Sequence, residues 1–111
     1  MAAPEPVRVR LLSLAELPDG QVVEVVADDR TLAVARVGSE VFAVHGTCPH
    51  AGGPLGDGQL DGCTLTCPWH GWSYDLRTGI SAVDPSVRVE TFGVRVIDGV
   101  AYLESSERPP G

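Results

Sequence analysis

Four side chains in two short segments could bind a transition metal together. The segment CPHAGGPLGDG carries Cys48 and His50, and the segment CPWHGWSYDLRTG carries Cys67 and His70. In an extended segment, residues i and i+2 point to one side of the chain, so Cys48 and His50 can reach neighbouring points of one target. A tight turn allows Cys67 and His70 to do the same. The pattern predicts a metal centre with two thiolate and two imidazole ligands.

Two kinds of metal centre use such ligands. A single zinc ion is one, but zinc fingers generally take their cysteine pair from one segment and their histidine pair from another. Here each segment supplies one sulfur and one nitrogen. Mixed pairs suit a two-iron cluster in which both thiolates bind one iron and both imidazoles bind the other. A zinc-stabilised binding module is the alternative.

The cysteine count favours metal ligands over disulfides. The chain has three cysteines, an odd number, and its first residues lack the apolar stretch of an export signal. Cys63 lies four residues before Cys67 and matches no ligand position, so we expect it to be a buried small hydrophobic residue. His45 ends an apolar alternating segment, and we expect its role to be structural.

Short alternating segments flank the candidate ligands. Apolar residues recur at every second position in VRVRLL, QVVEVV, TLAVARV, EVFAVH, VRVETFGVRVI and VAYLE, and helical periodicity is nearly absent. Turn sequences separate these segments, and Asp98-Gly99 is a strong hairpin signal. The sequence therefore predicts an all-β fold of small antiparallel sheets packed as a sandwich.

The region that holds the candidate ligands interrupts this alternation. It is rich in glycine and contains every cysteine, and only CTLTC has a strand pattern. A chain of 111 residues has room for one domain. We predict a single domain over 1–111, with β regions at about 7–45 and 80–104, an inserted loop-built subdomain at 46–79, and frayed termini at 1–6 and 105–111.

Charge and hydropathy limit the classes of partner. Fifteen acidic residues against eight basic residues give a formal net charge of −7. This balance argues against nucleic acid as a partner. An acidic surface would instead attract a basic face on a protein partner. No segment approaches the roughly 18 apolar residues of a membrane span, so we expect a cytoplasmic protein with no membrane partner.

The two ligand segments resemble those of the Rieske family, most closely the small Rieske-type ferredoxins that serve multicomponent aromatic-ring dioxygenases. The resemblance covers about residues 7–104 and rests on the paired motifs quoted above. It implies a Rieske fold and one [2Fe–2S] cluster per chain. The ligands that it implies for that cluster are Cys48, His50, Cys67 and His70.

The resemblance also implies a function. The protein would not be an enzyme but a one-electron carrier, which accepts electrons from a flavin-containing ferredoxin reductase and passes them to a terminal oxygenase. The sequence offers no convincing catalytic set of its own. A shuttle that presents one tip, with its two histidines, to two partners is most easily a monomer. The small Rieske subunit of an assimilatory nitrite reductase is the alternative within the family.

The chain departs from the high-potential members of the family. Those proteins have two further cysteines and a serine at positions that here hold Gly53, Trp69 and Trp72, although Tyr74 keeps their tyrosine. Hydrogen bonds to cluster sulfurs stabilise the reduced state, so their loss lowers the reduction potential. We expect a potential toward the low end of the Rieske range, about −150 mV.

Three features beside the ligands have two interpretations each. Trp69 and Trp72 could form an apolar rim for partner docking or shield the cluster from water. The loop glycines could permit tight turns or allow backbone N–H groups to approach the sulfides. Pro85 could belong to a third loop over the cluster or to an ordinary turn.

Overall fold

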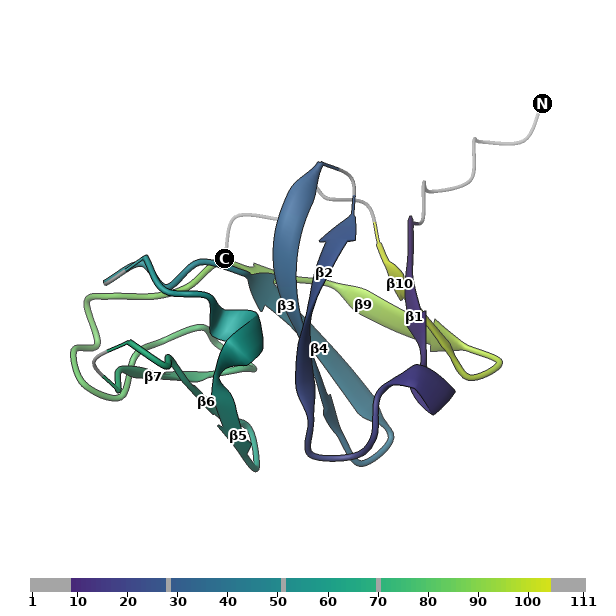
Figure 1. Ribbon diagram of the computed structural model, residues 1–111, viewed down its shortest axis with the longest axis horizontal. Helices are drawn as coiled ribbons and strands as arrows, with labels where there is room; N and C mark the ends of the chain where they lie inside the picture. The colour runs from purple at the N-terminus through teal and green to yellow at the C-terminus, as the bar shows by residue number, and fades with distance from the viewer. Residues whose placement is uncertain (1–8, 28, 51, 70, 105–111) are drawn as a thin grey trace.

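The computed structural model describes residues 9–27, 29–50, 52–69 and 71–104. In these ranges the chain forms short strands joined by turns, with two single-turn 3₁₀ helices (Figure 1). No helix in them is long and apolar enough to span a membrane. The elements are β1 (Val9–Ser13), η1 (Leu14–Glu16), β2 (Val22–Ala27), β3 (Arg30–Val37), β4 (Glu40–His45), η2 (Leu55–Asp57), β5 (Gln59–Asp61), β6 (Thr64–Thr66), β7 (Ser73–Asp75), β8 (Thr91–Phe92), β9 (Val94–Ile97) and β10 (Val100–Leu103).

The strands form three antiparallel sheets. Their strand orders are β1-β10-β9, β2-β3-β4-β8 and β5-β6-β7. The first two sheets lie together on one side of the molecule, and the small third sheet lies beside them with the loops that carry the candidate ligands (Figure 1). The predicted all-β fold of small antiparallel sheets is confirmed.

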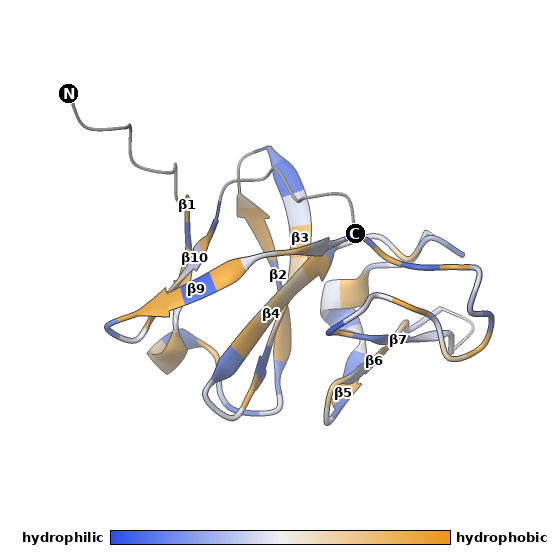
Figure 2. Ribbon diagram, turned by 180° about the vertical axis from the view of Figure 1, so that it is seen from behind, coloured by the Kyte–Doolittle hydropathy of each residue, from blue (hydrophilic) through white to orange (hydrophobic). Residues whose placement is uncertain are grey.

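Turn residues set where the strands reverse. Asp98 and Gly99 have φ values of 52° and 77°, and Ile97 pairs with Val100 across them. Positive φ at both central residues matches the twist of a two-residue hairpin, so the hairpin predicted at this site is confirmed. Figure 2 shows hydrophilic residues at this turn and at the β3–β4 turn, between more hydrophobic strands.

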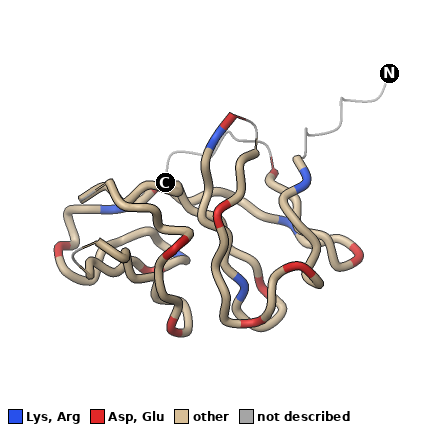
Figure 3. The backbone as a smooth tube through the Cα atoms, viewed as in Figure 1, with Lys and Arg blue, Asp and Glu red and all other residues tan. Residues whose placement is uncertain are grey.

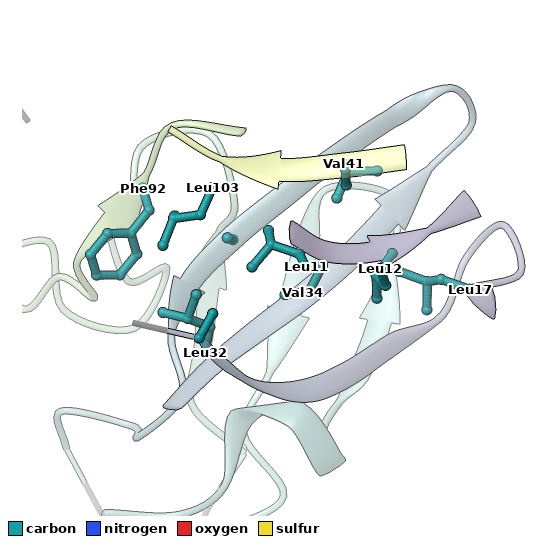
Figure 4. Packing of buried hydrophobic residues seen from close by; sticks show 11 residues of the cluster. Leu11, Leu12, Leu17, Leu32, Val34, Val41, Phe92 and Leu103 are labelled. Atoms are coloured by element: carbon teal, nitrogen blue, oxygen red, sulfur yellow. The ribbon is translucent and has the colours of Figure 1, made fainter. Parts of the chain in front are cut away.

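The strand β3 contributes to two hydrophobic cores, because its two faces are both covered. Leu32 and Val34 point into the first core, while Ala33 and Ala35 point into the second. Side chains alternate across a strand, so neighbouring residues serve opposite cores. Figure 4 shows the first core, with labelled side chains Leu11, Leu12, Leu17, Leu32, Val34, Val41, Phe92 and Leu103.

The second core lies under the candidate ligands. Leu55, Leu65, Tyr74 and Leu76 belong to it and are almost fully buried. The ligand region was expected to contain one strand, at CTLTC, but the structure has three, β5, β6 and β7. β5 and β7, which were not predicted, have three residues each, which is too short for alternation to be recognised.

One predicted strand is shorter than its sequence pattern. In VRVETFGVRVI, Val87 and Val89 alternate in one phase and Phe92, Val94 and Val96 in the other, and the strands begin only at Thr91 and are interrupted at Gly93. The preceding residues bond to different partners, because Val89 N–H donates to Gly79 and the Glu90 carbonyl accepts from His45. The change of phase therefore falls where the chain crosses between two parts of the fold.

Candidate metal centre

Two loops with similar internal hydrogen bonds bring Cys48 and Cys67 into the second core. Cys48 follows β4, and its N–H and C=O groups bond to Gly53 and Gly52 at 2.9 and 2.8 Å. Cys67 follows β6, and its N–H donates to the Trp72 carbonyl at 2.7 Å. Both cysteine side chains are only 1% exposed. The loops thus fold back on themselves and place each sulfur inside.

The two sulfurs are close enough to affect each other. Burial raises the pKa of Cys67, the Trp69 N–H group at 3.4 Å from the Cys67 Sγ lowers it, and the neighbouring Cys48 thiol raises it again. Two buried thiolates side by side repel each other unless a cation lies between them. Metal binding deprotonates thiols and supplies that positive charge. The paired cysteines therefore fit the thiolate half of an iron–sulfur centre.

Tyr74, the central residue of β7, contacts the first cysteine. Its hydroxyl lies 3.1 Å from Cys48 Sγ, and the tyrosine is 1% exposed. Burial raises the pKa of Tyr74, so the hydroxyl keeps its proton. When Cys48 is a thiolate, the tyrosine hydroxyl must therefore donate this bond. The family resemblance indicated only that the tyrosine is retained, whereas the structure places its hydroxyl beside Cys48 Sγ.

His50 is exposed, in contrast to the two cysteines. Its imidazole stacks on Trp72, with ring centroids 3.9 Å apart and planes 8° from parallel. His70, the fourth predicted ligand, lies outside the described residues. Among the residues that are described, no group of three or more His, Cys, Asp or Glu side chains could hold a metal ion. The complete ligand set therefore stays a prediction.

Gly53 is required by the packing of the two loops. An ideal Cβ atom on Gly53 would lie 2.8 Å from Trp69 Cγ and 3.0 Å from Cys67 Sγ. Trp69 itself is 50% exposed. Positions 53 and 69, where high-potential Rieske proteins are expected to carry cysteines, are thus in contact, and here a glycine packs against an indole ring. For Gly53, close approach to the neighbouring loop is the reason for glycine.

Two sequence expectations concern residues outside the predicted ligand set. Cys63 lies between β5 and β6 and is only partly buried, so the expectation that it is buried is wrong. Cys63 lies at the end of a hairpin, which is at the surface. Its carbonyl accepts the Leu76 N–H at 2.8 Å. His45 is exposed at the end of β4, and its backbone N–H donates to the Glu90 carbonyl.

The third loop closes on itself. Ser81 N–H donates to Val87, Val87 N–H donates to Asp84, and the Ser81 hydroxyl accepts from Val83. Pro85 is exposed within this loop. The ordinary turn is therefore present, and the role of Pro85 over a cluster stays a prediction.

A family model described as the Rieske [2Fe-2S] domain matches residues 7–93. The chain belongs to this Rieske family. Membership supports a [2Fe–2S] cluster as the cofactor, and it confirms the family that the two cysteine and histidine motifs indicated. The paired buried sulfurs, the tyrosine beside one of them and the exposed imidazole lie within the matched residues.

Several proteins similar to this chain are named as ferredoxins. Ferredoxin CarAc of Metapseudomonas resinovorans is 37% identical over 78 residues, which is 69% of this chain and 73% of CarAc. The Sphingomonas yanoikuyae B1 ferredoxin is 34% identical with a TM-score of 0.81, over 89% of this chain and 99% of its own. A chain in the complex of reduced oxygenase and oxidized ferredoxin in carbazole 1,9a-dioxygenase has a TM-score of 0.84 and 29% identity, covering 94% and 98%.

The nitrite reductase alternative is less well supported. A small subunit of an NADH-dependent nitrite reductase from Mycobacterium tuberculosis has a TM-score of 0.84 but only 23% identity, so it shows the shared fold alone. Relatives with higher identity are named as ferredoxin components of dioxygenase systems, such as that for anthranilate in Burkholderia cepacia. These names describe electron carriers rather than catalytic subunits. The ferredoxin prediction is therefore favoured for this Rieske protein.

Proposed function

We propose that this Rieske protein carries single electrons on one [2Fe–2S] cluster per chain. In this proposal Cys48 and Cys67 bind one iron, and His50 and His70 bind the other. The observation that carries it is the pair of adjacent buried sulfurs, one of which also contacts a buried tyrosine hydroxyl. When bound, the cluster would supply a site that takes up and releases one electron at a time.

The residues around the cluster would give it two different sides. Cys48 and Cys67 belong to the second core, which keeps water from the thiolate side. Tyr74 would donate a hydrogen bond to the Cys48 sulfur and stabilise negative charge there. His50 lies at the surface, where a partner could approach its ring closely. Electrons would therefore enter and leave through the imidazole side.

The proposed partners are a flavin-containing ferredoxin reductase as donor and a terminal oxygenase as acceptor. The named relatives and the solved complex of a ferredoxin with an oxygenase support the oxygenase as acceptor, and the reductase as donor follows from the family resemblance. We propose a cytoplasmic monomer that presents the same tip to both partners in turn. The subdomain at 46–79 would form that tip, between β regions at 7–45 and 80–104 of one domain.

The acidic composition supports protein partners with basic surfaces. Figure 3 shows acidic residues spread over both halves of the described backbone rather than gathered at one end. A net charge of −7 spread in this way would attract a basic partner over a long range rather than through a single contact patch. Electron transfer to a partner with a basic docking face should slow as ionic strength rises.

The first test is electron paramagnetic resonance of the purified protein after dithionite reduction, together with its visible spectrum and metal content. A rhombic signal of low average g, with about two irons and two sulfides per chain, supports mixed cysteine and histidine ligation. Redox titration of the same sample should give about −150 mV. A colourless, silent protein with one zinc per chain would contradict the proposal and favour a zinc-stabilised binding module.

A further inference from the structure

Trp72 lies against the ring of a proposed cluster ligand. The centroids of the His50 and Trp72 rings are 3.9 Å apart, and the ring planes differ by 8°. His50 is exposed, whereas Trp72 is partly buried and packs against the second core. The stack therefore joins a surface imidazole to an indole that core packing holds in place.

The main chain of Trp72 is fixed beside a second proposed ligand. Its carbonyl accepts the Cys67 N–H at 2.7 Å, and β7 begins at the next residue, Ser73. Trp72 thus has its backbone bonded to the loop that contains Cys67 and its side chain against His50 from the other loop. It is a physical connection between the two halves of the proposed ligand set.

The χ2 torsion of histidine has broad energy wells, so contacts with neighbouring groups decide the plane of the imidazole. Binding iron requires one ring plane, and lost freedom of the ring opposes binding. Metal-ligating histidines are usually oriented by a hydrogen bond to the second ring nitrogen. A parallel aromatic face can restrict the ring plane as well, because tilting the imidazole breaks the contact.

We propose that Trp72 is a positioning residue for His50, which fixes the plane of the imidazole for cluster binding and electron exit. This inference rests on the proposed function, since it takes His50 as a ligand. It assigns separate roles to the two tryptophans, which sequence analysis treated together. Trp72 acts on the ligand ring, whereas Trp69 covers Gly53 and is half exposed.

The test compares Trp72→Leu, Trp72→Phe and Trp69→Leu in the full chain with its cluster. Trp69→Leu is the matched control, because it removes an indole from the same loop without touching the His50 stack. We expect Trp72→Leu to lose the visible absorbance of the cluster about tenfold faster than the unsubstituted protein. Its reduced form should also show altered histidine nitrogen couplings in pulsed electron paramagnetic resonance.

The phenylalanine variant separates ring positioning from a general loss of packing. It keeps an aromatic face, so its nitrogen couplings should stay close to those of the unsubstituted protein, as should those of Trp69→Leu. Equal cluster lifetimes and unchanged couplings in Trp72→Leu would overturn the inference. A second measurement needs no variant: in a crystal structure of the full chain, His50 and Trp72 rings that do not lie parallel and in contact would also overturn it.

Failure of the proposed function gives a different result. If the unsubstituted protein holds no iron or sulfide, the electron-carrier proposal fails, and crystals of the full chain and of Trp72→Leu decide the positioning role. A His50 ring that turns or loses order only in the leucine variant supports positioning. A ring that keeps its plane without Trp72 contradicts it.

Discussion

At the scale of single residues, the site is governed by what each side chain can donate or exclude. The hydroxyl of Tyr74 lies 3.1 Å from Cys48 Sγ, and both residues belong to the second core. Ser81 is the one buried polar residue in the described part of the chain besides Tyr74, Cys48 and Cys67. A buried donor at this distance can act on the charge of the Cys48 sulfur.

Replacing Tyr74 with phenylalanine should lower the reduction potential by about 40 mV. The hydrogen bond, which the variant lacks, stabilises the more negative, reduced state by about 1 kcal/mol. A tenfold change in a one-electron equilibrium constant is about 1.4 kcal/mol and corresponds to about 59 mV, so about 1 kcal/mol corresponds to about 40 mV. Redox titration followed by visible absorbance measures the shift. Tyr102→Phe is the control, because Tyr102 lies in β10 on the far sheet. An identical potential in Tyr74→Phe would show that the hydroxyl does not act on the cluster.

Replacing Gly53 with alanine should reduce the iron content of the purified protein. The added methyl group would come within 3.0 Å of Cys67 Sγ and closer still to the Trp69 ring, so the sulfur or the indole must move. Gly93→Ala is the control, since its methyl group would meet only Glu104 side-chain atoms at 3.7 Å or more. Iron and sulfide analysis of both variants makes the comparison. Equal loading would mean that the loops can separate at no cost.

At the scale of elements, glycines with the same backbone conformation differ in what surrounds them. Gly79 and Gly99 have φ values of 78° and 77°. A Cβ atom on Gly99 would meet nothing within 4 Å, whereas one on Gly79 would overlap the carbonyl oxygen of Val89. Gly79 also accepts the Val89 N–H and donates to Asp75, so it joins β7 to the segment that leads into β8.

Alanine at these two positions should therefore have unequal costs. Gly99→Ala suffers only the backbone strain of a left-handed residue, about 1 kcal/mol of unfolding free energy. Gly79→Ala adds overpacking and should cost about 3 kcal/mol or more in total. Urea unfolding of both variants in the same cluster state measures the difference. Equal midpoints would show that the β7 turn and the 87–89 segment are not held together.

The extent of prediction from sequence also differs between elements. The long strands β2, β3 and β4 were recognisable because each has at least six residues and is rich in valine. The three-residue strands β5 and β7 were not, because they exist through pairing with β6 and not through a pattern of their own. The β9–β10 hairpin was predictable because Asp98 and Gly99 encode their turn locally.

Within the site, the same distinction applies to contacts between loops. The ligand types and the spacing within each loop were readable, since they lie a few residues apart. The stack of His50 on Trp72 and the contact of Trp69 with Gly53 were not, because each joins loops separated by more than a dozen residues and depends on the folded geometry. Cys63 was misassigned for a similar reason, since hairpin ends were not visible in so short a pair of strands.

At the scale of the whole molecule, the central four-stranded sheet separates two cores. The first core joins it to the β1-β10-β9 sheet, and the second joins it to the region that holds the proposed ligands. The two larger sheets and the first core can therefore supply stability, while the second core positions the proposed ligands. Leu32 and Leu65 are a matched pair for testing this division, because both are leucines with 0% exposure and each lies in a different core.

Leu32→Ala and Leu65→Ala should each lower the free energy of unfolding by about 2–5 kcal/mol, because each leaves a cavity in a packed core. Their effects on the cluster should differ, since Leu65 pairs directly with Tyr74 and shares a core with both cysteines, whereas Leu32 packs in the other core. Below the unfolding transition, Leu65→Ala should lose visible absorbance faster than Leu32→Ala. Equal rates in two equally destabilised variants would mean that the cluster responds only to global stability, and that the two cores act as one.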